Sequence, residues 1–289
     1  MMTTNHISTT TYTTRAVFSR DGAKISYLSM GSGPAVLVVP GALSMATGYT
    51  AFAKVLAEHF SVHIIERRGR GLSSPQGDDY SILKECEDVL ALQQEIGASL
   101  LVGHSFGGLV ALEVARNNPS FAKVAVYEPG VSTNGSIPMG WIPGYEKKLA
   151  EKKYLDAFVE FSLGVGPDRA RNTPPWLMKL LIPLFLRSHE RKLMFGLLSE
   201  NLREHREVAR LDSSYKNYRE ISAHVLLMYG GKSQTNWVDL SMKRLSEVLP
   251  RSETKEFPKL DHFGIDKKSP QEVAQAVSTF FREESYTGQ

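Results

Sequence analysis

The residues best suited to chemistry surround Ser105, in the run Gly103-His104-Ser105-Phe106-Gly107. The run fits G-x-S-x-G, a pattern in which a serine sits on a tight turn between a strand and a helix. Small neighbours let the backbone pass closely while the hydroxyl points outward. Amides at the start of the following helix, that of Phe106 among them, would face a developing oxyanion. The pattern therefore predicts a nucleophilic serine for acyl transfer, and its alternative is a glycine-rich structural turn.

A serine hydroxyl is a poor nucleophile at neutral pH, so Ser105 needs a base, most often a histidine that a third group orients. The chain has eight histidines. His104 adjoins the nucleophile and is expected to point away from it, and His63 and His224 fall within predicted strands, where buried, hydrogen-bonded side chains are expected. Surface positions are predicted for His6, His59, His189 and His205.

The elements that would position these groups alternate along the chain as short apolar runs and helical-period segments, which is typical of a parallel sheet flanked by helices. Asp21-Gly22 predicts a hairpin turn, so the sheet should begin with an antiparallel pair. Strands are predicted over Tyr12 to Ser19, Ala23 to Met30, Ala35 to Val39, Val62 to Glu66, Ser99 to Gly103, Lys123 to Tyr127, His224 to Tyr229 and Glu253 to Phe257. Helices are predicted over Tyr49 to His59, Ile82 to Ile96, Phe106 to Asn118, Val238 to Leu249 and Pro270 to Glu284.

One interval, from Gly130 to Tyr218, has helical patterns only. We expect a helical cap subdomain over 132–218, inserted into a core domain of 15–131 and 219–285 that follows a disordered lead-in over 1–14. The cap's apolar helix faces are expected chiefly to pack, and also to line an apolar cleft above Ser105 that favours a hydrophobic substrate. These faces comprise Trp141, Tyr145 and Leu149, and the run Trp176, Leu177, Leu180, Leu181, Leu184 and Phe185.

Composition is that of a globular enzyme, with 289 residues, 42% hydrophobic and 22% charged. The net charge of +3 is spread along the chain and predicts no nucleic-acid partner. Arg67, Arg68 and Arg70 form the densest basic cluster, which is expected in a solvated loop. The lone Cys86 excludes an internal disulfide and a cysteine-based metal site. No signal pattern or membrane-length apolar run is present, so a cytoplasmic protein without a membrane partner is expected.

From about Ala23 to Phe281 the chain resembles the α/β-hydrolase superfamily. Besides the serine pattern, Glu66 to Ser73 reads ERRGRGLS, which is similar to the superfamily's D-x-R-G-x-G-x-S loop. The resemblance implies a mostly parallel eight-stranded sheet with flanking helices and an inserted helical cap. It implies that the catalytic histidine is His262, which lies after the last strand and before the final helix. It also implies a second oxyanion donor in the turn Val39-Pro40-Gly41-Ala42, where we expect the amide of Ala42 to serve.

The third triad member departs from the superfamily's commonest pattern, which has an aspartate just beyond the strand at 224–229. This chain has no carboxylate there, and the nearest one downstream, Asp239, falls within a predicted helix. Some branches, including haloalkane dehalogenases and zearalenone-lactone hydrolases, carry the acid at the end of the preceding strand, where this chain has Glu128. Glu128 is preferred because ligand chemistry is expected at that sheet edge. Asp239, a dyad without an acid, and an ordinary strand-end carboxylate at 128 stay open.

Together, Ser105, His262 and Glu128, with the amides of Ala42 and Phe106, predict a serine hydrolase without a cofactor or a metal ion. Its substrate would be a small hydrophobic carboxylic ester or lactone, cleaved through an acyl-enzyme on Ser105 by a monomer or homodimer. Thioester, amide or carbon-carbon cleavage would use the same groups. A cofactor-free lyase and a non-catalytic ligand-binding module are the alternatives from other classes.

Overall fold

The computed structural model describes residues 12–116, 118–166, 168–233 and 235–283. At its centre lies an eight-stranded sheet with the strand order β1-β2-β4-β3-β5-β6-β7-β8. The strands are β1 (Thr13–Phe18), β2 (Lys24–Gly31), β3 (Ala35–Val39), β4 (Ser61–Ile65), β5 (Leu100–His104), β6 (Lys123–Tyr127), β7 (His224–Gly230) and β8 (Ser252–Phe257). Strand β2 is antiparallel to β1 and β4, and every other neighbouring pair is parallel. The predicted α/β fold class is confirmed, whereas the predicted lead-in lies largely outside the described residues.

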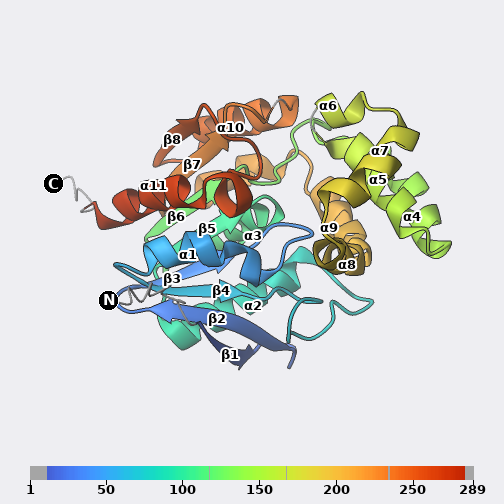
Figure 1. Cartoon of the computed structure of the whole chain (residues 1–289). Coiled ribbons are helices and arrows are strands. Elements are labelled where there is room, and N and C mark those ends of the chain that lie inside the picture. Colours follow the sequence, from blue (N-terminus) through green and yellow to red (C-terminus); the bar gives the residue numbers. More distant parts are fainter. Residues whose placement is uncertain (1–11, 117, 167, 234, 284–289) are drawn as a thin grey trace, which may run out of the picture.

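Helices cover both faces of this sheet, and strand β3 shows why. Its Leu37 and Val39 side chains belong to one apolar cluster and Val36 and Val38 to the other, because successive side chains of a strand point to opposite faces. Helices α1 and α11 cover one face, and α2, α3 and α10 cover the other (Figure 1). Their bounds are α1 (Thr50–Leu56), α2 (Ile82–Ile96), α3 (Phe106–Ala115), α10 (Asn236–Val248) and α11 (Pro270–Arg282), with short helical turns η1 (Ala46–Tyr49), η2 (Ser214–Glu220) and η3 (Gly264–Lys268).

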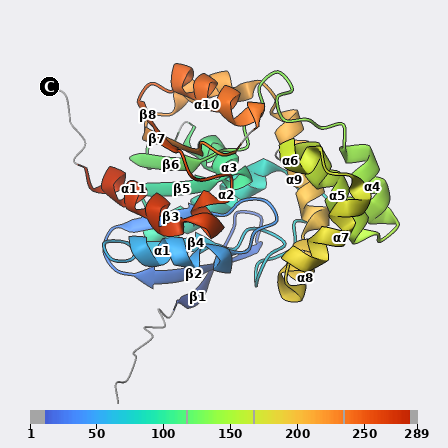
Figure 2. The ribbon, with the colours of Figure 1, turned by 45° about the horizontal axis from the view of Figure 1, so that its top comes forward.

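The remaining helices follow one another between β6 and β7 and gather on one side of the molecule (Figures 1 and 2). They are α4 (Ile142–Ala150), α5 (Tyr154–Val165), α6 (Asp168–Arg171), α7 (Pro175–Phe185), α8 (Ser188–Gly196) and α9 (Leu198–Arg210). Trp141 and Tyr145 pack with Leu198 in a small core of their own. The segment expected as a cap is therefore a layer of helices. The chain leaves the sheet at the end of β6 and returns at β7, the neighbouring strand.

The apolar run on α7 differs from its predicted role in packing. Trp176, Leu180 and Leu184 have relative exposures of 68%, 59% and 74%. They are spaced four residues apart, so they share one face of the helix, and that face is turned to solvent. The prediction that these residues chiefly pack is therefore wrong for these three positions.

The basic cluster after β4 is also placed differently from its prediction. Arg67, Arg68 and Arg70 are only 1–2% exposed. Arg68 pairs with Asp88 on α2 and with Asp21 in the first hairpin, each at 2.7 Å. The expected solvated loop is wrong because helices supply acids that pair with these guanidinium groups, and buried charges are stable only when they are paired in this way.

His205 provides a second correction, because it was expected at the surface and is buried. Its ring lies edge-on to Trp141 and Phe161, at 5.2 Å from each ring centroid. Its Nδ1 lies 2.9 Å from the carbonyl oxygen of Asn201, one helical turn earlier. Helix α9 turns this face toward α4 and α5, so His205 is part of the core of the helical layer.

Candidate active site

Ser105 occupies the sharp turn between β5 and α3. Its backbone angles are φ 52° and ψ −122°, a region that residues other than glycine rarely adopt. The turn is held from both sides, since its N–H donates to the carbonyl of Tyr127 at 3.0 Å and its own carbonyl accepts from the amide of Gly130 at 2.8 Å. Glu128, between these two partners, also has a positive φ, of 42°. The two strained residues are therefore braced by the same backbone hydrogen bonds.

The turn after β3 packs directly against this serine turn. A β-carbon on Gly107 would overlap the carbonyl oxygens of Val39 and Pro40, and one on Gly41 would lie 3.1 Å from Cβ of Ser105. Glycine at 107 therefore permits the two turns to touch. The Gly41 amide already donates to the Tyr49 hydroxyl at 2.9 Å, whereas within the described chain the amides of Ala42 and Phe106 donate to no group. Both amides thus remain free to bind an oxyanion.

The imidazole of His262 is joined to the carboxylate of Glu128. Nδ1 of His262 lies 2.7 Å from Oε2 of Glu128, and Glu128 is fully buried. The second carboxylate oxygen accepts hydrogen bonds from the Gly230 amide, at 2.8 Å, and from the Ser233 hydroxyl. Three donors therefore converge on one carboxylate, a set that fixes its orientation.

Sequence reasoning left Asp239 as an alternative acid, and the structure places it elsewhere. Asp239 lies in the first turn of α10 and is exposed. His262 lies beside His104, the residue that precedes Ser105, with the two ring centroids 4.9 Å apart. No hydrogen bond between the Ser105 hydroxyl and His262 is present among the described residues. His63, in contrast, is buried in β4 between the hydroxyls of Ser29 and Ser61.

The pKa values of the titratable groups here depart from their usual ranges. Burial opposes the charged form of His262, yet the hydrogen bond and charge of Glu128 outweigh it and raise the pKa of His262. Burial, reinforced by nearby His262, holds the pKa of His104 well below its ordinary value. Burial also raises the pKa of Asp266 to about 6. At neutral pH, the site therefore contains a neutral His104 and an imidazole at 262 that readily accepts a proton.

Arg67 lies beneath the two turns, and its contribution to the site was not anticipated from the sequence. Its guanidinium donates to the carbonyl of Gly41 at 3.1 Å and lies 4.6 Å from the ring centroid of Phe106. Two further hydrogen bonds reach Glu85, and one reaches Glu204 on α9. The similarity of residues 66–73 to a superfamily loop was the signal that could have located it. Arg67 thus supports both turns that carry the free amides.

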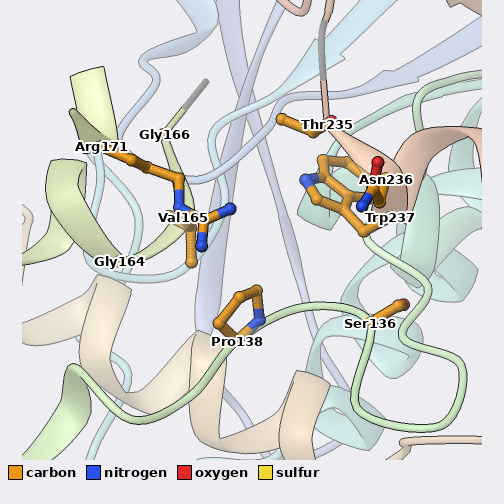
Figure 3. Close-up of a pocket in the computed structure, with 9 residues that line it drawn as sticks. All are labelled: Ser136, Pro138, Gly164, Val165, Gly166, Arg171, Thr235, Asn236 and Trp237. Carbon is orange, nitrogen blue, oxygen red and sulfur yellow. The ribbon is translucent and has the colours of Figure 1, made fainter. Parts of the chain in front are cut away.

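A cavity of about 200 Å³ opens beside this constellation (Figure 3). Trp237, in its wall, lies with its ring centroid 5.8 Å from that of His262. Figure 3 shows Arg171 across the cavity from the indole, with Pro138 and Ser136, both from the loop after β6, along the lower side of this view. The cavity lining therefore combines apolar groups and an aromatic face with hydroxyl, amide and guanidinium groups.

Comparison with known proteins identifies the class of this fold. The sequence matches the Alpha/beta hydrolase family over residues 36–276. The match covers well over half of the 289 residues, and this chain therefore belongs to that family. Within the described residues, no helix combines the length and the hydrophobicity needed to cross a membrane.

Three relatives illustrate the similarity. The N-formylmaleamate deformylase of Pseudomonas putida is 30% identical over 158 residues, which span 53% of this chain and 56% of that enzyme. The match thus covers little more than half of the deformylase. An alpha/beta hydrolase from Sphaerobacter thermophilus superposes with a TM-score of 0.78 and 27% identity, covering 92% of this chain and all of the other. An esterase from Exiguobacterium antarcticum shares the fold, with a TM-score of 0.71, 17% identity and coverage of 93% and 99%. Family and relatives together support a hydrolytic enzyme.

Proposed function

We propose that this protein is a serine hydrolase that cleaves a carboxylic ester or lactone with a hydrophobic acyl group. The observation that carries the proposal is the hydrogen bond between His262 and Glu128. Glu128 is buried, accepts three hydrogen bonds and, like Ser105, lies in a strained turn. Such an arrangement gives the imidazole a fixed tautomer, with its proton on Nδ1 and its lone pair on Nε2. The lone pair is what a serine nucleophile requires of its base.

The proposed reaction has two steps. The Ser105 oxygen attacks the carbonyl carbon while Nε2 of His262 takes the hydroxyl proton, and the amides of Ala42 and Phe106 bind the oxyanion of the tetrahedral intermediate. That intermediate expels the alcohol, which receives the proton from His262. A water molecule then attacks the acyl-serine while His262 takes its proton. The bond from the acyl carbon to the Ser105 oxygen breaks, that oxygen recovers the proton from His262, and the carboxylic acid leaves. Glu128, hydrogen-bonded to Nδ1, stabilises the imidazolium that forms in each step.

The test combines active-site labelling with turnover. A fluorophosphonate probe should modify Ser105 in the wild-type protein, and mass spectrometry of the digest should find the adduct on that residue alone. Ser105→Ala should abolish labelling and the hydrolysis of a panel of nitrophenyl esters of graded acyl length. Ester hydrolysis that survives in Ser105→Ala would contradict an acyl-serine mechanism. Tight ligand binding without turnover in either protein would favour a binding module.

A second candidate, hydrolysis of an amide on an acidic substrate, is favoured by two observations. The Pseudomonas putida relative is a deformylase of N-formylmaleamate, and Arg171 lines the cavity across from Trp237 (Figure 3). A guanidinium has five N–H donors, so it can bind a substrate carboxylate in addition to another partner. The discriminating assay measures formate release from N-formylmaleamate and from a matched neutral N-formyl amide, against the ester panel. Faster turnover of the charged amide than of every ester would favour this candidate over the first.

A further inference from the structure

A chain of buried hydrogen bonds, which the proposed chemistry does not use, begins at the turn formed by residues 39–42, which we call the oxyanion turn. It ends at the loop that carries His262. The Gly41 amide donates to Oη of Tyr49 at 2.9 Å. Oη of Tyr49 lies 2.6 Å from Nδ1 of His104, and Nε2 of His104 lies 2.9 Å from the carbonyl oxygen of His262. Tyr49 is fully buried and His104 is 3% exposed. Water therefore does not compete for these groups.

The direction of each proton in this chain follows from the chemistry of its members. The pKa of His104 is well below the ordinary value because its ring is buried, so the ring is neutral and carries one N–H. The carbonyl of His262 can only accept, and the proton of His104 is therefore on Nε2. Its Nδ1 must then accept, and it accepts the hydroxyl proton of Tyr49. The Tyr49 oxygen is left with lone pairs for the Gly41 amide, so all four groups are satisfied in one direction.

The two ends of this hydrogen-bond chain are parts of the site whose positions relative to Ser105 must be fixed. Gly41 adjoins Ala42, and Tyr49 therefore holds the backbone next to the amide proposed to bind the oxyanion. His262 supplies the base. His104 itself adjoins Ser105 in the sequence, and its ring lies 4.9 Å from that of His262. The chain thus spans oxyanion turn, nucleophile turn and base without touching the place where substrate would bind.

We propose that Tyr49 and His104 are positioning residues, which hold the oxyanion turn and the base in fixed register on either side of Ser105. The inference rests on the proposed serine-hydrolase function. The fold does not depend on these hydrogen bonds, because the His262 loop has other supports. Tyr127 donates to the carbonyl of Asp261 at 2.8 Å, and the Lys232 amide donates to that of Leu260 at 2.8 Å. Loss of the Tyr49 hydroxyl should therefore loosen the site while the protein still folds.

The decisive variant is Tyr49→Phe, which removes one oxygen and leaves the ring. Displacement of reacting groups by about 1 Å costs on the order of 10²-fold in rate. We therefore expect kcat, and the rate of fluorophosphonate labelling at Ser105, to fall about 10- to 100-fold, with KM changed far less. The matched control is Tyr218→Phe, because Tyr218 is also fully buried and its hydroxyl donates to Glu113 at 2.9 Å, at the far end of α3. The control should lose stability without loss of kcat.

Two substitutions of His104 separate the halves of the chain. The amide nitrogen of His104→Gln can reach the position of Nε2 and donate to the His262 carbonyl, whereas that of His104→Asn reaches only as far as Nδ1. We expect Gln to preserve more kcat than Asn. Amide hydrogen exchange supplies a readout independent of activity, in which Tyr49→Phe should accelerate exchange in the peptides around both Gly41 and His262.

The outcomes distinguish this inference from the proposed function. If wild type is labelled at Ser105 while Tyr49→Phe matches Tyr218→Phe in kcat, labelling rate and exchange near His262, the inference is overturned and the serine hydrolase stands. If wild type is not labelled, the proposed function fails. Independently of labelling, faster amide exchange in Tyr49→Phe that is confined to the Gly41 peptide would show that Tyr49 does not couple the oxyanion turn to the His262 loop. Slower labelling with faster exchange at both sites supports the inference.

Discussion

Replacement of Glu128 by glutamine is the sharpest perturbation of this site, because the change replaces one heavy atom in a fully enclosed group. The carboxylate accepts from His262 on one oxygen and from Gly230 and Ser233 on the other. A glutamine has a single acceptor oxygen, which must face Gly230 and Ser233 because both of them donate. Its NH₂ group then faces Nδ1 of His262. That contact forces the imidazole proton onto Nε2, where the lone pair for Ser105 should be.

The size of the effect follows from the lost tautomer. An aspartate-to-asparagine change in the triad of a serine protease, with the same tautomer inversion, lowers kcat about 10⁴-fold. We expect a similar fall for Glu128→Gln, which corresponds to about 5 kcal/mol of transition-state stabilisation. The assay is kcat for the best ester of the nitrophenyl panel, with circular dichroism to establish that the variant folds.

Asp239→Asn is the matched control for this experiment, since it makes the same chemical change on an exposed residue of α10. Exposed substitutions rarely change the free energy of unfolding by more than about 0.5 kcal/mol, and Asp239 lies outside the proposed triad, so both the fold and kcat should be essentially unchanged. The reasoning is refuted if Asp239→Asn loses orders of magnitude while Glu128→Gln turns over normally. It is also refuted if both variants are silent, because a dyad without an acid would then suffice.

Three further results are expected. In wild type, kcat/KM should fall as the pH drops through the pKa of His262, because a protonated imidazole cannot accept the serine proton. Glu128 raises that pKa, so the midpoint should lie above the ordinary value of about 6.5. A midpoint below 6.5 would contradict the assignment. Gly107→Ala should lower kcat more than it lowers the melting temperature, since its methyl group would displace the carbonyl of Val39 in the oxyanion turn. Arg68→Met should cost about 3–5 kcal/mol of unfolding free energy in urea titrations because it leaves the buried carboxylate of Asp88 without its partner, whereas Arg206→Met, in an ion pair about half exposed on each side, should cost at most about 1 kcal/mol.

The elements nearest to Ser105 were predictable because their signals are local. The bounds of β3, α2 and β6 coincide with the predicted runs Ala35 to Val39, Ile82 to Ile96 and Lys123 to Tyr127. Each run is bounded by residues that end regular structure and is filled by side chains of a single period. A strand, a serine between glycines and a helix then fix the turn of Ser105 without any long-range information.

The buried charges were not predictable, because the partners of each are distant in the sequence. Arg67 meets Glu85, 18 positions away, and Glu204, 137 positions away. A basic cluster viewed alone therefore indicated solvent. Glu128 could be nominated from its place at a strand end, but its hydrogen bonds depend on Ser233 and His262, both more than 100 positions further on. Tyr49 gave no signal at all, since nothing local marks a hydroxyl that bridges two turns.

The carboxylate of Glu204 belongs to α9, yet the groups that neutralise it belong to the segment after β4. Arg67, Arg70 and Gln76 all donate to one of its oxygens, and Glu204 is wholly enclosed. A helical layer transplanted from another hydrolase would leave Arg67 and Arg70 without a counter-charge unless it carried an acid at the position equivalent to Glu204. An uncompensated buried charge costs several kcal/mol, a large share of the stability of a typical domain. Recombination that alters the helices over this sheet must therefore exchange the arginine-bearing loop along with them.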